Sequence, residues 1–391
     1  MKRKGDTWNE SQTHKDPVTG RTVRQITTAG DINEKAPYHT RTTFTDDGEF
    51  LIFSTLRDGA SALCRAHVAT GEITQLTDRV PSTEKQISAR TIAPRSGWIP
   101  YWLGGSLRAV NIHTLQERTI IEDIGPQWSP RLSSVDPEEE FIVTPIGTED
   151  PAVLASIPAD VPRVYPEAWP SGRCRITRII RVPFAGGEPE VIHTEVGINI
   201  NHLEHCPTDG DLLYIDRDRP PMWHAGGDYS KTSRCWTLRI STGELTPLTP
   251  RAEAKFQIHA VWSWDGQFIF YHGPAVLVRG PCPWYVGAVR PNGEIYREWT
   301  FQEGKHYGHV AAAPDRPAII LDGNVTPDRL VWLYIDGPEP RFETICEHKT
   351  ELNSLPANQA THAHPSTDRS GRWIAYNVAR AGRTDVHVVE V

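Results

Sequence analysis

Short apolar runs separated by turn residues make up most of this chain. Runs such as residues 50–53 and 318–321 have the length of strands, and no stretch of about ten residues shows a convincing apolar helical period. The 30 Gly and 32 Pro are spread through the sequence and supply turns between such runs. The pattern predicts an all-β protein built from many short antiparallel strands.

A repeat of about fifty residues organises these runs. Its clearest copies place a tight turn before an apolar run, at residues 44–53, 264–271 and 369–376, and Thr-Gly-Glu hairpins recur at 70–72 and 242–244. Anchoring on the turn glycine or its equivalent gives seven units, at Gly48, Gly97, Glu139, Gly210, Gly266, Arg316 and Gly371. Repeats of four short strands at this period predict a seven-bladed β-propeller.

The two ends of the chain predict how the ring of blades closes. Residues 385–391 form the third strand of the last blade, and residues 19–27 look like its missing outer strand. We therefore expect a single domain over residues 1–391, closed by pairing of an N-terminal strand with the C-terminal blade. The longest interruption is a Pro-rich insertion at residues 147–173, for which a lid over the channel and a tolerated surface loop are both open.

One position of the repeat carries cationic or imidazole side chains in most units. It lies seven residues before each turn anchor and is occupied by Arg41, Arg90, Leu132, Leu203, His259, His309 and His364, with His202 beside Leu203. The position begins the innermost strand of a blade, and innermost strands line the central channel. We therefore expect these side chains to converge at one end of the ring.

The last two units predict a metal site. His362 and His364 alternate along an extended segment, so their imidazoles point to the same side, and Gln359 precedes them. His309 is in register in the preceding unit. Three imidazoles and an amide oxygen suit Mn, Fe, Ni, Co or Zn better than a thiophilic metal. The predicted ligands are His309, Gln359, His362 and His364.

The remaining residues of the register predict chemistry on a carboxylate. His259 would be an imidazole beside the metal, and Arg41, Arg90 and Arg234 would surround it with positive charge. A base flanked by a metal and guanidinium groups suits proton abstraction α to a carboxylate. In a uronic acid that proton is on C5, and loss of the C4 oxygen completes a β-elimination. We expect Arg41, Arg90 and His202 to contact this substrate.

The chain resembles the oligogalacturonate lyase family in motifs spread over almost its whole length. The matching pieces are Asp16-Pro17-Val18-Thr19-Gly20, residues 38–53, Asn201-His202, Ser233-Arg234-Cys235-Trp236, Ile258-His259, Gly308-His309 and residues 359–365. The last of these matches the family's metal motif, Q-x-T-H-x-H-P.

The resemblance implies an intracellular β-propeller lyase of pectin breakdown. It implies a manganese ion held by His309, Gln359, His362 and His364, with His259 as the base and Arg234 stabilising the developing charge. The chain departs from the family's pattern at residues 305–308, 310–314 and 147–173. These departures leave another oligouronate open as the substrate.

Composition and charge narrow the alternatives. A formal net charge of −8 argues against nonspecific nucleic-acid binding, and six scattered Cys predict buried free thiols. The apolar runs are too short to span a bilayer, and no apolar core follows the basic N-terminus, so we expect a cytoplasmic protein without a membrane partner. The competing class is a noncatalytic TolB-like or WD40-like binding propeller. A prolyl-oligopeptidase-type hydrolase would need a G-x-S-x-G motif, which the sequence lacks.

Overall fold

The computed structural model describes residues 2–38, 42–82, 87–161, 163, 171, 173–218, 233–248, 257–274, 283–301, 308–323, 328–355 and 358–391. Within these ranges the helical elements are α1 (Pro151–Ser156) and the 3-10 turn η2 (Asn358–Thr361). Backbone contacts divide the chain into a first unit, residues 1–104, 108–118 and 305–391, and a second unit, residues 105–107 and 119–304. The prediction of a single domain over 1–391 stays a prediction. Among the described residues, no helix is both long and apolar enough to cross a membrane.

The first unit contains three groups of antiparallel strands. The first group is β4 (Ile32–Lys35), β5 (Phe50–Arg57), β6 (Ala60–His67) and β7 (Glu72–Gln75), with β8 (Val80–Pro81) beside β6. The next is β26 (Val310–Ala312), β27 (Ala318–Leu321), β28 (Arg329–Tyr334) and β29 (Arg341–Glu347). The last is β30 (Ser366–Thr367), β31 (Trp373–Arg380), β32 (Arg383–Glu390) and β3 (Thr22–Gln25). The boundary between the units runs through a further sheet, β9 (Ile87–Ala89), β10 (Trp98–Leu103), β11 (Ser106–Asn111) and β12 (Glu117–Ile121).

The second unit contains three more sheets. One holds β13 (Ser129–Pro130), β14 (Ser134–Val135), β15 (Phe141–Thr148), β16 (Ile176–Pro183) and β17 (Glu190–Val196). Another holds β18 (Leu203–Cys206), β19 (Asp209–Asp216), β20 (Cys235–Arg239) and β21 (Leu245–Pro247). The third holds β22 (Ile258–Trp262), β23 (Ile269–Pro274), β24 (Trp284–Val289) and β25 (Ile295–Phe301). The seven predicted repeats thus correspond to seven groups of strands among the described residues, and the all-β prediction is confirmed.

Apolar side chains of neighbouring sheets pack together inside each unit. In the first unit, Trp332 of β28 packs with Ile374 and Tyr376 of β31. In the second unit, Tyr214 of β19 packs in one cluster with Tyr271 of β23. Because both faces of a blade are buried in this way, each sheet needs its neighbours to bury its apolar surface.

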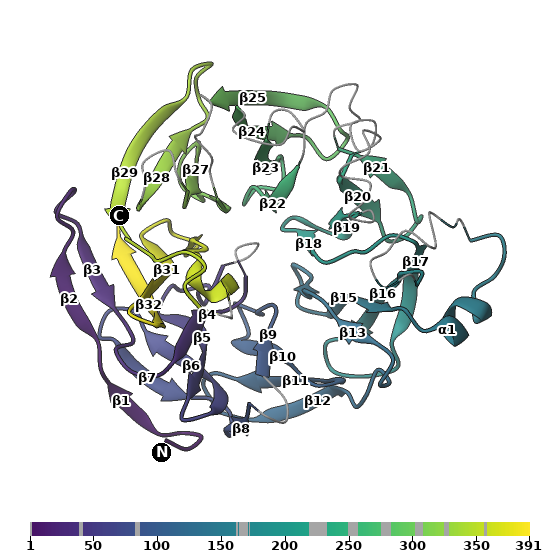
Figure 1. The fold of residues 1–391 in the computed structure, drawn as a ribbon, viewed down its shortest axis with the longest axis horizontal. Coiled ribbons are helices and arrows are strands. Elements are labelled where there is room, and N and C mark those ends of the chain that lie inside the picture. Colours follow the sequence, from purple (N-terminus) through teal and green to yellow (C-terminus); the bar gives the residue numbers. More distant parts are fainter. Residues whose placement is uncertain are drawn as a thin grey trace. The chain divides into compact units, whose positions relative to one another are not determined.

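The N-terminal segment pairs with the C-terminal strands, as predicted. Strand β3 runs antiparallel to β32, with Val23 opposite Val389 and Gln25 opposite His387. Figure 1 shows β2 (Gln12–Lys15) and β3 in purple beside the yellow β32. The preceding strand, β1 (Thr7–Asn9), pairs with β7 at the edge of the first strand group. The segment therefore covers edges of both the first and the last group.

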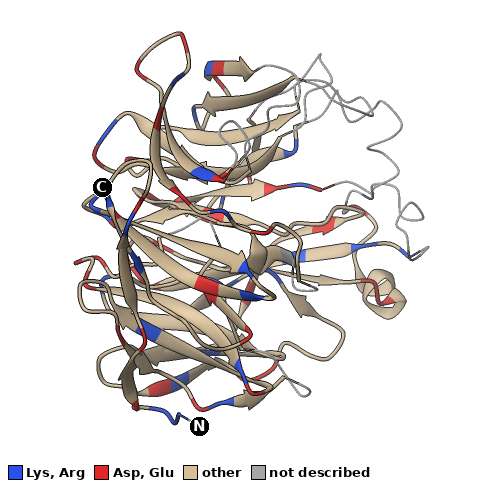
Figure 2. Cartoon of the chain, turned by 60° about the vertical axis from the view of Figure 1, so that its left-hand side comes forward, with Lys and Arg blue, Asp and Glu red and all other residues tan. Residues whose placement is uncertain are grey.

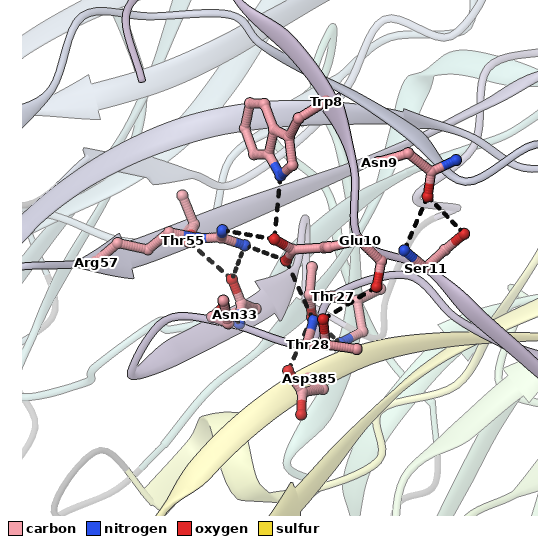
Figure 3. A network of polar contacts seen from close by, with 12 residues as sticks. Trp8, Asn9, Glu10, Ser11, Thr27, Thr28, Asn33, Thr55, Arg57 and Asp385 are labelled. Atoms are coloured by element: carbon pink, nitrogen blue, oxygen red, sulfur yellow. Dashed lines mark hydrogen bonds and ion pairs between the residues drawn. The ribbon is translucent and has the colours of Figure 1, made fainter. Parts of the chain in front are cut away.

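Glu10, between β1 and β2, ties this segment to the first strand group (Figure 3). Its carboxylate accepts hydrogen bonds from Arg57 at 2.6 and 3.0 Å, and from Trp8 Nε1 at 3.1 Å. The backbone N–H of Thr28 donates to the same carboxylate. Burial raises the pKa of Glu10, but these donors, chiefly Arg57, outweigh it and hold the pKa below its ordinary value.

Charged side chains are otherwise dispersed. Figure 2 shows Lys and Arg interspersed with Asp and Glu along the described strands and turns. Opposite charges form local surface pairs, such as Arg181 with Glu190 and Arg372 with Glu390, both at 2.8 Å. Such exposed pairs contribute little to stability. The five described cysteines are free and buried, as predicted, and Cys282 lies outside the described residues.

Five of the seven turn anchors of the repeat share a left-handed backbone, whereas Gly210 and Arg316 do not. Their φ angles are 71° at Gly48, 70° at Gly97, 61° at Glu139, 69° at Gly266 and 73° at Gly371. Glycine recurs there because it adopts this conformation without a Cβ penalty. Glu139 keeps the same turn although its side chain is unfavourable there, so this degenerate copy is a true member of the repeat.

Two glycines of the second unit separate the cost of the left-handed backbone from the cost of a clash. Gly266 and Gly243 have φ of 69° and 71°, but an added Cβ would lie 2.4 Å from Thr208 Oγ1 at Gly266 and meet nothing within 4 Å at Gly243. Gly243→Ala should lower the free energy of unfolding by about 1–2 kcal/mol. Gly266→Ala should lower the free energy of unfolding by about 1–3 kcal/mol more than Gly243→Ala does, because its Cβ also clashes. Urea unfolding of both variants tests this, and equal losses would contradict it.

Glu10 should stabilise the fold in a pH-dependent way. Because its folded-state pKa lies below the ordinary value of 4.5, its contribution is present above pH 4.5 and is lost as the pH falls through the folded value. Glu10→Gln should lower the free energy of unfolding at neutral pH by about 1 kcal/mol, and the difference should shrink in acid. Urea unfolding of the wild type and of this variant, at neutral pH and at an acidic pH below 4.5, measures the difference. The exposed Glu49, changed to Gln, is the control and should leave the free energy of unfolding at neutral pH nearly unchanged.

Candidate functional site

Three of the predicted ligands gather in the first unit. The ring nitrogens of His309, His362 and His364 lie within 4.8 Å of one another, and Nε2 of His309 is 3.2 Å from Nε2 of His364. His309 and His364 are buried and His362 is half-buried. Burial, and next the neighbouring His309, lowers the pKa of His362, which favours the neutral form that binds metals. Three converging imidazoles suit a divalent cation.

Tyr38 and Gln359 lie beside this cluster. The phenol oxygen of Tyr38 is 2.9 Å from His309 Nε2 and donates to Gln359 Oε1 at 3.4 Å. The Tyr38 ring also packs against His364, with a ring-centroid distance of 4.5 Å. The amide oxygen of Gln359, an exposed residue of η2, therefore reaches the cluster through Tyr38. No role was predicted for Tyr38 from the sequence.

Asp322, at the end of β27, orients His309. One carboxylate oxygen accepts the His309 backbone N–H at 2.5 Å, and the other lies 3.1 Å from His309 Nδ1. The second oxygen also accepts the backbone N–H of His364. Burial alone would raise the pKa of Asp322, but the interactions with His309 hold it at about 2. Because Nδ1 is occupied, Nε2 of His309 is the nitrogen turned towards the cluster.

Arg234 and His202 meet on one buried carboxylate in the second unit. Asp216 Oδ2 lies 2.7 Å from Arg234 Nη2 and 2.5 Å from His202 Nδ1. Arg234 Nε also donates to Asp218 at 2.5 Å. Burial lowers the pKa of Arg234, but Asp218 and Asp216 raise it well above its ordinary value, so the guanidinium stays charged. The predicted positive charge of Arg234 is thus largely balanced by two carboxylates.

His259, on β22, has an unusual backbone and an imidazole partner. Its φ is 51°, and the pairing of β22 with β23 shifts between Ile258 and Val261. His259 Nδ1 lies 2.9 Å from Nε2 of His272, and the indole nitrogen of Trp284 donates to His272 Nδ1 at 3.0 Å. His364 has a similar φ of 45°. A left-handed residue other than glycine costs about 1–2 kcal/mol, and such strain clusters at functional sites.

A second register connects these partners. Four consecutive repeats carry a polar residue thirteen positions after the register position: Asp216, His272, Asp322 and Asn377. The first three contact His202, His259 and His309, and the Asn377 side chain donates to the His362 carbonyl at 3.4 Å. Sequence reasoning missed all four roles. The constant spacing from the first to the second strand of a blade was the signal that could have found them.

The structure places the remaining predicted residues as follows. Arg90 follows β9 and is exposed. Its charge acts on Glu34: burial raises the pKa of Glu34, and the nearby Arg90 partly offsets that rise. Arg41 lies outside the described residues. Of the insertion at 147–173, the structure describes α1 and its flanks but not residues 162, 164–170 and 172. The lid and surface-loop interpretations of the insertion both stay open.

Comparison with known proteins establishes the fold. No protein-family model and no characterised protein matches the sequence. Among solved structures, an oligogalacturonate lyase in complex with manganese is 18% identical, covering 100% of this chain and 98% of that chain with a TM-score of 0.79. An oligogalacturonate lyase from Vibrio parahaemolyticus is 19% identical, covering 99% of this chain and 98% of that chain with a TM-score of 0.74.

A chain of the mitotic checkpoint complex is also similar, at 10% identity and a TM-score of 0.55, covering 100% of this chain and 94% of that chain. At these identities the likeness shows the fold alone. It confirms the predicted β-propeller class, and it confirms the resemblance to oligogalacturonate lyases at the level of the fold. Because one fold serves unrelated functions, the activity has to be argued from the site.

The histidine cluster should bind a divalent cation. Metal-free protein dialysed against Mn²⁺ should retain the ion, and His364→Ala should abolish retention because it removes a buried ligand. Asp322→Asn should weaken binding about 10–100-fold, since it disturbs the orientation of His309. His113→Ala, which changes an exposed hairpin histidine, is the control. Elemental analysis after dialysis measures the retained ion, and equal retention by all variants would show that the cluster binds no metal.

Proposed function

We propose that this protein is a metal-dependent lyase that cleaves short oligogalacturonates, or a related oligouronate, by β-elimination. The observation that carries the proposal is the cluster of His309, His362 and His364, backed by Asp322. It occurs on a fold shared with an oligogalacturonate lyase whose structure contains manganese. A cytoplasmic role in pectin degradation is part of the proposal.

The donor set of the cluster fits Mn²⁺. Three imidazole nitrogens and the Gln359 amide oxygen would hold the ion, and all four belong to ligand types that manganese accepts. When bound, the metal would polarise the uronate carboxylate and stabilise negative charge that develops next to C5. The Tyr38 hydroxyl lies against His309 Nε2 and Gln359 Oε1, so it would have to give up its contact with His309 Nε2 when the ion binds.

The residues of the second unit supply charge and proton transfer in this proposal. His259 takes the proton from C5, and the electron pair of that bond forms the C4–C5 double bond. The C4–O bond breaks, and the leaving oxygen departs with the rest of the sugar chain and takes a proton from solvent water. Arg234 stabilises the developing charge, and its pairing with Asp216 and Asp218 holds the guanidinium in one orientation. Arg41, Arg90 and His202 bind the substrate. The proposal requires all these groups to act on one substrate molecule.

Turnover of digalacturonate tests the proposed function. With Mn²⁺, the ultraviolet absorbance of a 4,5-unsaturated uronate should appear, and a chelator should stop it until metal is restored. His259→Ala should lower the rate about 10²–10⁴-fold, the usual contribution of a proton-transfer group. His113→Ala should turn over normally.

Other outcomes have distinct meanings for the proposal. Metal binding without turnover of digalacturonate, but with turnover of another oligouronate, would change only the substrate. Failure on every oligouronate tested would leave a noncatalytic propeller that binds ligands. Turnover that survives the chelator would contradict the role of the metal.

A further inference from the structure

His202 and Asp216 form a carboxylate–imidazole pair in the second unit. His202 precedes β18, and Asp216 ends β19. Asp216 Oδ1 accepts the backbone N–H groups of Asn201 and His202, each at 2.9 Å, and Oδ2 lies 2.5 Å from His202 Nδ1. The Asp216 side chain is completely buried, whereas 21% of the His202 side chain is exposed. Because Nδ1 faces Asp216, His202 exchanges a proton with a ligand through Nε2.

The charges around this pair favour a doubly protonated ring at His202. Burial raises the pKa of Asp216, but His202 and Arg234 outweigh it and hold the pKa below its ordinary value, so the carboxylate is ionised at neutral pH. Arg234 pairs with both Asp216 and Asp218. One guanidinium against two carboxylates leaves one negative charge in excess, and an imidazolium at His202 balances it. Such balance is favoured because an unpaired charge away from water is costly.

The carboxylate behind an imidazole has a different consequence in the first unit. There Asp322 holds His309, whose ring gathers with those of His362 and His364. Within the described residues, His202 belongs to no such group of three ligand side chains. An imidazole that is oriented by a carboxylate, and that is not gathered with other ligands, suits proton transfer.

We propose that His202 is the catalytic acid that delivers a proton to the leaving C4 oxygen, with Asp216 as its positioning residue. The inference rests on the proposed function and adds a residue to it. As His259 takes the C5 proton, the C4–O bond breaks and its electron pair goes to the oxygen. That oxygen takes the Nε2 proton of His202, and the neutral ring then regains a proton from solvent water. Water is therefore still the source of the proton, and His202 delivers it.

The two histidines have partners that suit opposite proton transfers. Asp216 stabilises an imidazolium at His202, so this ring begins the reaction with a proton to give. His259 lies against the imidazole of His272, which adds no fixed charge. The ring of His259 therefore lacks the carboxylate that would favour its protonated form, and a neutral ring is the form in which a base acts.

Nuclear magnetic resonance of the full chain labelled with ¹⁵N tests the charge of His202 without any substrate. Backbone-to-ring correlations assign the signals, and the ring ¹⁵N shifts distinguish an imidazolium from either neutral tautomer. At pH 7 we expect both ring nitrogens of His202 to carry a proton. Asp216→Asn should shift the ring towards a neutral form, because it removes one negative charge. A neutral His202 in the wild type would overturn the inference.

A substrate whose leaving group needs no proton tests the role of His202 in the reaction. Such a substrate is a methyl glycoside of galacturonate with fluorine in place of the C4 oxygen, from which fluoride leaves as an anion and the same C4–C5 double bond forms. With Mn²⁺ present, His202→Gln should lower kcat on digalacturonate about 10²–10⁴-fold. The same variant should eliminate fluoride at nearly the wild-type rate. His259→Ala should slow both reactions, because both need the base.

His193→Gln is the matched control for these rates. It removes another imidazole of the second unit that lies against a carboxylate, with Nε2 3.1 Å from Glu195 Oε1, but on the outer strand β17. Both rates should be unchanged in this variant. If His202→Gln does not fold, Asp216→Asn takes its place and should slow digalacturonate cleavage more than fluoride release.

The outcomes separate this inference from the proposed function. Equal losses on the two substrates in His202→Gln would overturn the acid role, since the residue would then only bind substrate or support the fold. A neutral His202 in an active lyase would overturn this inference alone. If the wild type cleaves no oligouronate and releases no fluoride, the proposed function fails and the acid role fails with it, while the resonance result still decides the charge of His202.

Discussion

The candidate site depends on one recurring contact within a blade. A polar side chain at the second strand holds a histidine at the start of the first strand. Asp322 binds both the backbone and the ring of His309, and Asp216 does the same for His202. A buried imidazole without a partner would be costly, and a partner on one nitrogen also decides which nitrogen faces outward. The same contact therefore gives the buried imidazole a hydrogen-bond partner and orients its other ring nitrogen outward.

The repeats differ in the residue that the second strand places behind each histidine. Histidines at equivalent positions therefore have different hydrogen-bond partners. A carboxylate behind His309 favours a ring that offers Nε2 to a metal. In contrast, His272 behind His259 carries no fixed charge and takes its orientation from Trp284. One geometric position is thus backed by a carboxylate in one blade and by an imidazole in another.

Pairing of the chain's two ends places a further constraint on the first unit. Strand β3 completes the last strand group, while β1 extends the first group through β7. Glu10 lies between these two pairings and is held by Arg57. The last blade carries His362 and His364, so the pairing of β3 with β32 also supports the blade that presents two of the three clustered histidines.

The sequence by itself determined the all-β class, the seven repeats and the pairing of the two ends, because turn glycines and apolar runs are local signals. It also determined the candidate ligands, since alternation and the repeat register are properties of the chain alone. Only the tertiary structure decided the partners of those residues: Tyr38 beside the cluster, Asp216 and Asp218 around Arg234, and Trp284 behind His272. Those contacts depend on strand pairing and packing, which bring together residues whose relation is not written in any local pattern. The carboxylates around Arg234 and the imidazole partner of His259 were therefore beyond the reach of the sequence.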